Sequence, residues 1–263
     1  MTNTLILTSC NRIKQVLLGL SLTSQIVKNP FNVVICDNST PDLSSEDALQ
    51  YHNATDAHSA VTHQNYCNDI SLYRDAHKYF PNVQNFRVIH SSPVRPKHEG
   101  DTLLLGLGFM QASLLGFEDN YALKVTGVSI LKKDILSQLP SILGDKQVVT
   151  WGRTAMPEIL STRLIGGRPE TFTRIMSQGV HGHLVDGQDI YFCEEKMRYL
   201  LGKYLEPHQI HSTNEVETEY LVDQGVPGGD ALMRQRIERV IVEENIDTEA
   251  TPWLKEFLQG GIW

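Results

Sequence analysis

Apolar residues occur in short unbroken runs through the first half of the chain, and polar, turn-forming residues follow each run. The runs at 4–8 and 32–36 are rich in β-branched and aliphatic residues, which is typical of buried strands. Between them, apolar residues recur at three- and four-residue spacing over 12–27, which predicts a helix. A strand, a helix and a strand in this order predict a βαβ unit with parallel strands.

The same kinds of pattern continue along the rest of the chain. Three more strands are predicted, at 85–90, 121–125 and 147–151. Helices are predicted near 72–79, 102–117, 130–139, 170–177, 194–204, 214–223 and 229–244, although the pattern is less regular after residue 153. Thr251 and Pro252 supply a cap and a first-turn proline for a last short helix. We therefore expect an α/β fold with a mostly parallel sheet flanked by helices.

Composition and charge narrow the class of protein. A chain of 263 residues with 41% hydrophobic and 21% charged residues is ordinary for a globular domain with a sizeable core. The net charge of −8 argues against nucleic acid as a partner, since proteins that bind it concentrate positive charge. A local cluster of arginine and lysine is still enough to bind a small anionic molecule.

Cysteine usage and the apolar segments bear on the compartment. The four cysteines form no CxxC pair, which favours free thiols in a reducing compartment. The amino-terminal residues lack the basic start and cleavage site of a signal peptide. The most apolar stretch, 102–117, is shorter than the ~20 residues that cross a bilayer. These features predict a soluble, cytoplasmic protein without a membrane span.

Ligands of open α/β sheets bind beyond the carboxyl ends of the strands, so the polar residues at those ends are candidates for a site. The residues to examine are Thr8, Ser9, Cys10 and Asn11 after the first strand, Asp37 and Asn38 after the second, and residues 124–128, with Lys124, Thr126 and Gly127, at the fourth. Arg12, which opens the first helix, lies next to the first group.

Two stretches carry a resemblance to a known family. LILTSCNRIKQVLLGLSL and FNVVICDNSTPD resemble the opening of GT-A-fold glycosyltransferases, especially the large family-2 group. Asn11-Arg12 and Asp37-Asn38-Ser39 match the family's pattern. The segment 97–104 resembles its "K-G-x-G-E-A" element, with Asp101 in place of the glutamate.

Further elements resemble a subset of bacterial and viral polysaccharide-building enzymes. Lys124-Val125-Thr126-Gly127 is similar to the subset's "K-(I/L)-T-G-R-Y" element, with Val128 in place of its arginine. The segment 161–164 is similar to its "T-R-L-F", and Cys193-Glu194 to its later "(I/L)-E". The resemblance implies a single GT-A-like domain over 1–263. It would contain a nucleotide-binding half (1–128), an acceptor and catalytic half (129–210) and a C-terminal helical extension (211–263), with the helical and loop region closing over the site.

The resemblance also implies how a nucleotide-sugar donor, linked to UDP or GDP, would bind. Asp37 would accept a hydrogen bond from the imide N–H of the base, unless Asp37-Asn38 is only a turn. Arg12 could approach the ribose or the phosphates, or serve only as a helix-start residue.

Most GT-A enzymes hold a divalent metal with Asp-x-Asp, whose first and last positions are occupied here by Thr126 and Val128. Neither residue is a good metal ligand. The leaving diphosphate would then be neutralised by cationic side chains, namely Lys124, Arg153, Arg163 and Arg168. We therefore expect no metal cofactor, with manganese as the disfavoured alternative. The plain alternative for Lys124 is a strand-end lysine that reaches solvent.

A transferase also needs a base for the acceptor hydroxyl. Glu194 begins a predicted helix and shares an inward stripe with Met197 and Leu201. The alternative is a carboxylate that only complements the helix dipole. Asp186, or Asp189, is the substitute. The His181-Gly182-His183 segment reads as a polar loop rather than a metal site, and the acidic stretch 215–220 as the solvated face of a helix.

The sequence thus predicts a glycosyltransferase that moves a sugar from a nucleotide-sugar donor to a glycan or polysaccharide acceptor. A nucleotidyltransferase and an NAD-dependent enzyme are ranked lower, because no glycine-rich phosphate loop follows the first strand. A degenerate GT-A fold that only binds glycans is the non-enzymatic alternative.

Overall fold

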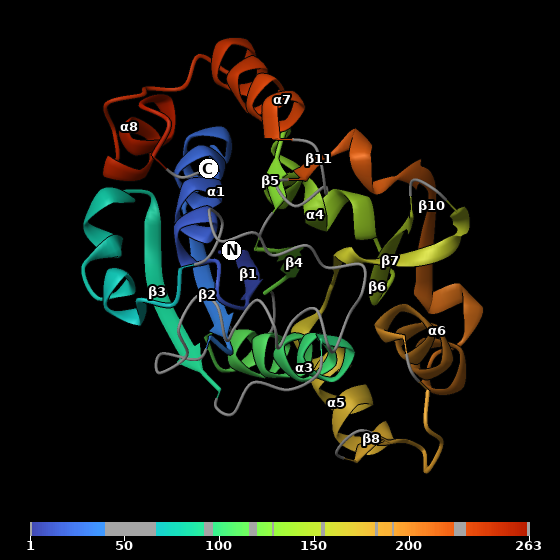
Figure 1. Ribbon diagram of the computed structural model, residues 1–263. Coiled ribbons are helices and arrows are strands. Elements are labelled where there is room, and N and C mark those ends of the chain that lie inside the picture. Colours follow the sequence, from blue (N-terminus) through green and yellow to red (C-terminus); the bar gives the residue numbers. More distant parts are fainter. Residues whose placement is uncertain are drawn as a thin grey trace.

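The computed structural model describes residues 2–39, 67–91, 97–115, 120–127, 129–153, 156–181, 184–190, 192–223 and 230–261. Its centre is a seven-stranded sheet with the order β10-β6-β7-β4-β1-β2-β3 (Figure 1). Strand β7 runs antiparallel to both of its neighbours, and all the other neighbouring strands pair in parallel. The predicted mostly parallel α/β architecture is therefore confirmed.

The strands of the main sheet are β1 (Thr4–Ser9), β2 (Phe31–Asp37), β3 (Val83–His90), β4 (Ala122–Thr126), β6 (Val148–Arg153), β7 (Met156–Gly167) and β10 (Ile210–Val216). Two small sheets pair β5 (Ser129–Leu131) with β11 (Leu221–Asp223), and β8 (Val180–His181) with β9 (Leu184–Val185). The α-helices are α1 (Ile13–Ile26), α3 (Lys97–Leu115), α4 (Ile135–Leu143), α5 (Pro169–Gly179), α6 (Cys193–Tyr204), α7 (Asp230–Glu243) and α8 (Pro252–Leu258). Short 3₁₀ turns are η2 (Ile70–Tyr73), η3 (Ala76–Tyr79), η4 (Pro207–Gln209) and η5 (Glu217–Glu219).

Helices cover both faces of the sheet (Figure 1). Apolar residues of α1, α4, α7 and α8 share one core with alternate strand residues such as Leu5 and Leu7. Residues of α3, α5 and α6 share the other core with the intervening ones, such as Ile6. A sheet buried on both faces needs apolar side chains at successive positions, which explains the unbroken apolar runs of the sequence.

The carboxyl-terminal residues extend both the sheet and one helical layer. Strand β10 pairs in parallel with β6 at the edge of the sheet. Helix α8 packs on α1, where Thr251 Oγ1 donates to Ser21 Oγ at 2.9 Å and Lys14 pairs with Glu256. Within the described part of the chain, no helix has the length and apolarity that a membrane crossing requires.

Two sequence-based expectations were wrong, and one long strand was not predicted. The predicted helix at 214–223 is instead the end of β10, followed by η5 and β11. The predicted helix at 130–139 begins only at Ile135, because β5 occupies 129–131 and pairs antiparallel with β11. The less regular region after Arg153 contains β7, a strand of 12 residues. These strands depend on partners far away in the sequence, which local spacing does not reveal.

Gly127 follows β4 directly and lies close to the end of β1. Its N–H donates to the carbonyl oxygen of Thr8 at 2.8 Å. A Cβ atom at this position would lie 2.5 Å from that oxygen and 2.8 Å from Val16 Cγ2. The strand-end turn after Thr126 therefore requires a glycine for steric reasons alone.

We expect Gly127→Ala to lower the free energy of unfolding by about 1–3 kcal/mol, as overpacking does, measured by urea denaturation. Gly202→Ala is the matched control, because a Cβ there meets no atom within 4 Å. Its position inside α6 favours alanine by up to about 1 kcal/mol. A wild-type denaturation midpoint for Gly127→Ala would contradict the close approach of the two strands.

Candidate active site

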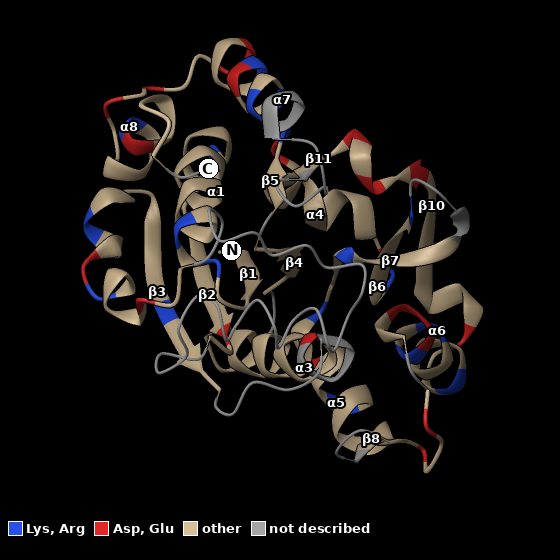
Figure 2. Ribbon diagram, viewed as in Figure 1, with Lys and Arg blue, Asp and Glu red and all other residues tan. Residues whose placement is uncertain are grey.

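Lys124 is a charged residue within the sheet, whereas Figure 2 shows most other charges on the outer helices. Only 2% of it is exposed. Its Nζ donates to the Thr162 carbonyl oxygen at 2.5 Å and to Thr126 Oγ1 at 3.1 Å. Burial lowers the pKa of Lys124, and the nearby carboxylates of Asp101 and Glu194 oppose that shift. The alternative of a lysine that reaches solvent is therefore wrong.

Thr162 joins Lys124 to Glu194. The carbonyl oxygen of Thr162 accepts from Lys124, while its Oγ1 donates to Glu194 Oε1 at 3.3 Å. Glu194 lies in the first turn of α6 and is half-buried, whereas Glu195 is exposed. Met197 is buried on the inward stripe, as predicted. Strands β4 and β7 and helix α6 thus meet at one chain of polar contacts.

Asp101 of α3 belongs to the same neighbourhood. Burial and then the charge of Asp101 raise the pKa of the Cys193 thiol to about 12. Burial and the carboxylates of Asp37 and Asp101 likewise raise the pKa of the Cys10 thiol to about 12. Asp101 therefore lies within electrostatic reach of Lys124, of the start of α6 and of the loop after β1.

Asp37 is fully buried at the end of β2. Its Oδ1 accepts from the Ser39 N–H at 2.8 Å and lies 3.4 Å from His90 Nδ1, and its Oδ2 accepts from the Tyr73 hydroxyl at 3.1 Å. Burial and the charge of Asp37 raise the pKa of Tyr73 well above its ordinary value. The carboxylate is enclosed by protein donors, so a base could contact it only if Tyr73 or His90 moved.

The loop after β1 is fixed by backbone contacts to its neighbours. Asn11 has a positive φ of 52° and donates its N–H to Ser39 Oγ at 2.7 Å. The Ser9 carbonyl accepts from the Asn38 N–H at 3.0 Å. The backbone of Arg12, which precedes α1, forms an isolated parallel β-bridge with Cys67. Thr8, Ser9, Asn11 and Arg12 therefore lie beside the end of β2, as the sequence predicts.

Three buried polar atoms at this edge have no hydrogen-bond partner among the residues that the structure describes. They are Thr8 Oγ1 and Ser9 Oγ, at the end of β1, and Asn38 Oδ1, just after Asp37. Such atoms are rare in folded proteins, where burial without a partner is unfavourable. They lie beside the strand ends at which open α/β sheets bind ligands, and a ligand in that position would satisfy them.

The structure does not bring Asp186 to this cluster. Asp186 accepts from Tyr204 at 2.9 Å and pairs with Lys203 at 2.7 Å. Tyr204 lies ten residues after Glu194, or roughly 15 Å along α6. Arg153 ends β6 and pairs with Met156, while the preceding Gly152 pairs with Leu160, two residues before Thr162. The role of Arg153 in the site stays a prediction.

Other predicted residues lie beside the cluster or outside the described ranges. Arg163 lies close enough to Lys124 to affect its pKa. Arg168 directly follows the last residue of β7, Gly167. Its guanidinium lies over the Tyr121 ring. Val128, Gly182 and His183 fall outside the described residues.

Glu217 is a buried residue next to the cluster that the sequence did not reveal. The stretch 215–220 was expected to be a solvated helix, which is wrong: Glu217 lies in η5, and only 3% of it is exposed. Ser161 Oγ donates to its carboxylate, and an Arg163 guanidinium nitrogen lies 4.0 Å away. Ser161 also accepts the Arg163 N–H at 3.1 Å. The carboxyl-terminal extension therefore holds the β7 segment that carries Thr162.

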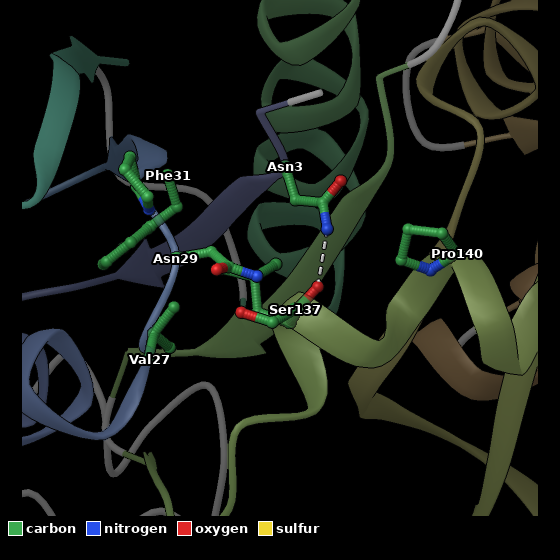
Figure 3. A pocket seen from close by; sticks show the side chains of 8 residues that line it. Asn3, Val27, Asn29, Phe31, Ser137 and Pro140 are labelled. Carbon is green, nitrogen blue, oxygen red and sulfur yellow. Dashed lines mark hydrogen bonds between the residues drawn. The ribbon is translucent and has the colours of Figure 1, made fainter.

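A small pocket lies at the opposite edge of the sheet (Figure 3). Asn3, Phe31 and Ser137 line it, and Asn3 Nδ2 donates to the Leu136 carbonyl at 2.6 Å. Asn3 and Phe31 stand at the amino ends of β1 and β2. This pocket is thus remote from Lys124 and is not the candidate active site.

The fold and the site define an α/β protein whose candidate ligand edge combines a buried ammonium group with several carboxylates. No protein-family model matches the sequence. No curated protein matches it either.

Solved structures show distant likeness. The glycosyltransferase GlyE of Streptococcus pneumoniae TIGR4 matches at 8% identity with a TM-score of 0.48, over 81% of this chain and 45% of GlyE. TarS 1–349 of S. aureus matches at 15% identity with a TM-score of 0.48, over 98% and 71% of the two chains. The mannosyltransferase PcManGT of Pyrobaculum calidifontis matches at 11% identity with a TM-score of 0.47, over 98% and 68%. The chain thus spans less than half the length of GlyE.

We expect Glu217→Ala to lower the free energy of unfolding by about 1–3 kcal/mol, because it leaves the buried Ser161 hydroxyl without its acceptor. Thermal or urea denaturation measures the change. The matched control is Glu219→Ala, in the same turn but exposed, which should alter stability by less than about 0.5 kcal/mol. Equal effects of the two substitutions would contradict a structural role for Glu217.

Proposed function

We propose that this protein transfers a sugar from a nucleotide-linked donor to a glycan acceptor. The observation that carries the proposal is the chain of contacts from Lys124 through Thr162 to Glu194. Each of the three comes from one of the segments that resemble polysaccharide-building enzymes, 124–127, 161–164 and 193–194. Three segments far apart in the sequence thus supply Lys124, Thr162 and Glu194, which are joined by hydrogen bonds.

The diphosphate of a UDP- or GDP-linked donor would lie at the end of β4. An ammonium group has three N–H donors, and Lys124 directs two of them to Thr126 and Thr162. Within the described part of the chain, its third N–H makes no hydrogen bond, so a phosphate oxygen would accept it, and the partly exposed Arg163 adds positive charge nearby. Thr8 and Asn38, whose oxygen atoms have no partner among the described residues, would contact the nucleoside beside Asp37.

The residues at the end of β4 do not fit a divalent metal. The Lys124 ammonium lies 3.1 Å from Thr126 Oγ1, so a positive charge already occupies the position that an Asp-x-Asp carboxylate would offer to the metal. Divalent metals favour carboxylate oxygens over a lone hydroxyl beside an ammonium group. We therefore propose that fixed cationic side chains neutralise the leaving diphosphate without a metal.

Glu194 would act as the general base. Its carboxylate would take the proton of the acceptor hydroxyl as that oxygen bonds to the anomeric carbon of the sugar. The bond between the anomeric carbon and the phosphate oxygen breaks, and the nucleoside diphosphate leaves with the electron pair. The hydrogen bond from Thr162 orients the carboxylate. A base on the acceptor side suits inversion at the anomeric carbon.

A thermal-shift series with UDP, GDP and their sugars, in EDTA and in manganese, tests the donor site. We expect stabilisation in EDTA, since a ligand at 100 times its dissociation constant adds about 2.7 kcal/mol. Lys124→Met should fold, because an apolar chain replaces a buried charge, yet lose the shift. The control Lys28→Met alters an exposed residue and should keep it. Stabilisation only with manganese would refute the metal-free site.

Release of nucleoside diphosphate from the stabilising donor, with and without glycan acceptors, tests the base. Glu194→Gln should lower the rate by about 10²- to 10⁴-fold, the usual contribution of a positioned base, while the donor-induced thermal shift stays. The matched control is Glu195→Gln, which changes the exposed neighbouring glutamate and should keep the wild-type rate. Full activity in Glu194→Gln would place the base elsewhere, and glycan binding without any turnover would indicate a non-enzymatic protein.

A further inference from the structure

A groove lies between α6 and the edge of the sheet formed by β6, β7 and β10. Its volume is about 300 Å³, at the lower end of small-ligand pockets. The residues that line it are Thr150, Trp151, Gly152, Leu160, Arg198, Leu201, Gly202, Ile210, Ser212 and Thr213. Strand irregularities open this part of the sheet, because the pairing of β6 shifts register after Thr150 and that of β10 after Ser212.

Two walls of the groove lead to Glu194. On α6, Arg198 follows Glu194 by four residues, so the two side chains are neighbours on one helical face, with about 5–6 Å between their Cβ atoms. On β7, Leu160 precedes Thr162 by two residues, so both side chains lie on the same face of the strand. Since Thr162 donates to Glu194, the groove adjoins the carboxylate from both sides.

The groove and the donor residues lie on opposite sides of β7. The sheet order places β4 and β1 on one side of this strand, and β6 and β10 on the other. Lys124 reaches Thr162 from the first side. A molecule in the groove would therefore approach Glu194 from the side opposite the donor, as an acceptor must.

The lining has the chemistry of a sugar site. Hydroxyl groups of Thr150 and Ser212, 3.4 Å apart, lie beside the apolar side chains of Leu160 and Leu201. Sugar rings combine hydroxyl groups with apolar faces, so such a mixed surface suits them.

Arg198 is the only charged side chain among the described residues that line the groove. It is exposed, and it makes no hydrogen bond or ion pair to the part of the chain that the structure describes. Its planar fork of N–H groups matches a carboxylate or a phosphate. A neutral glycan would leave that fork without a partner.

We infer that this groove binds the acceptor, and that Arg198 selects glycans carrying a carboxylate or phosphate about one sugar residue from the accepting hydroxyl. The inference rests on the proposed function, because it takes Glu194 as the base. It adds the substrate class: an anionic glycan rather than a neutral one.

Binding to a glycan array of neutral, uronic-acid-containing and phosphorylated oligosaccharides, with UDP or GDP present, tests the inference. We expect the bound glycans to be anionic, and the two anionic sets separate carboxylate from phosphate recognition. Arg198→Ala should weaken binding by about 10-fold or more, and Arg198→Lys should restore only part of it, because lysine lacks the fork. Binding should also weaken as salt is raised.

Gly202→Phe gives an independent variant, because open space surrounds Gly202 and a ring there would fill the groove. It should abolish glycan binding, while Gly202→Ala keeps it. Both variants and Arg198→Ala should keep the donor-induced thermal shift, which shows that they fold. Arg174→Ala, an exposed arginine on α5, is the charge control and should bind as the wild type does.

Preference for neutral glycans, unchanged binding by Arg198→Ala, or no bound glycan would each overturn the inference. The two proposals fail separately. If the protein shows no preference for anionic glycans but the donor still raises its melting temperature, the transferase proposal stays intact. Arg198-dependent binding of anionic glycans without any nucleotide or nucleotide-sugar shift would refute donor use but keep the groove.

Discussion

The buried ammonium group of Lys124 is the constraint on which the site depends. A charge removed from water must be compensated by hydrogen bonds and opposite charge, or the fold loses stability. Here the Thr162 carbonyl and the Thr126 hydroxyl supply the hydrogen bonds, and Asp101 and Glu194 supply negative charge. This requirement ties β4 to β7 and brings the start of α6 against the sheet. The same interaction that makes the lysine tolerable therefore assembles the candidate active site.

Strand β7 organises the two halves of the molecule around that constraint. It is the strand that opposes its neighbours in the main sheet, and its successive side chains serve different partners. Ser161 and Arg163 turn toward Glu217 of η5, whereas Thr162 turns toward Glu194 of α6. One short segment thus joins the carboxyl-terminal extension, the proposed base and the proposed donor site, with the groove on its far side.

Residues that carry the family resemblance also have structural reasons to be where they are. Gly127 is required by the approach of β4 to the Thr8 carbonyl, whatever binds nearby. Asp37 holds Tyr73 and His90 in addition to any contact with a base. The resemblance at Gly127 and Asp37 is therefore better evidence for the fold than for the activity. The contacts among Lys124, Thr162 and Glu194 are the more specific functional feature, because packing alone does not require a lysine there.

The sequence by itself determined β1, β2 and β4, α1 and the helices α3, α5 and α6, because each is encoded in a continuous or helically spaced apolar pattern that a core on both faces demands. It also predicted β3, whose side chains are half-buried or exposed at the edge of the sheet. It also marked Lys124 and Glu194. Only the tertiary structure decided that β7 and β11 are strands, that Glu217 is buried, and that Asp186 lies apart from the cluster. Strand pairing and the burial of a carboxylate depend on residues far away in the chain, so no local pattern of hydrophobic and polar positions can specify them.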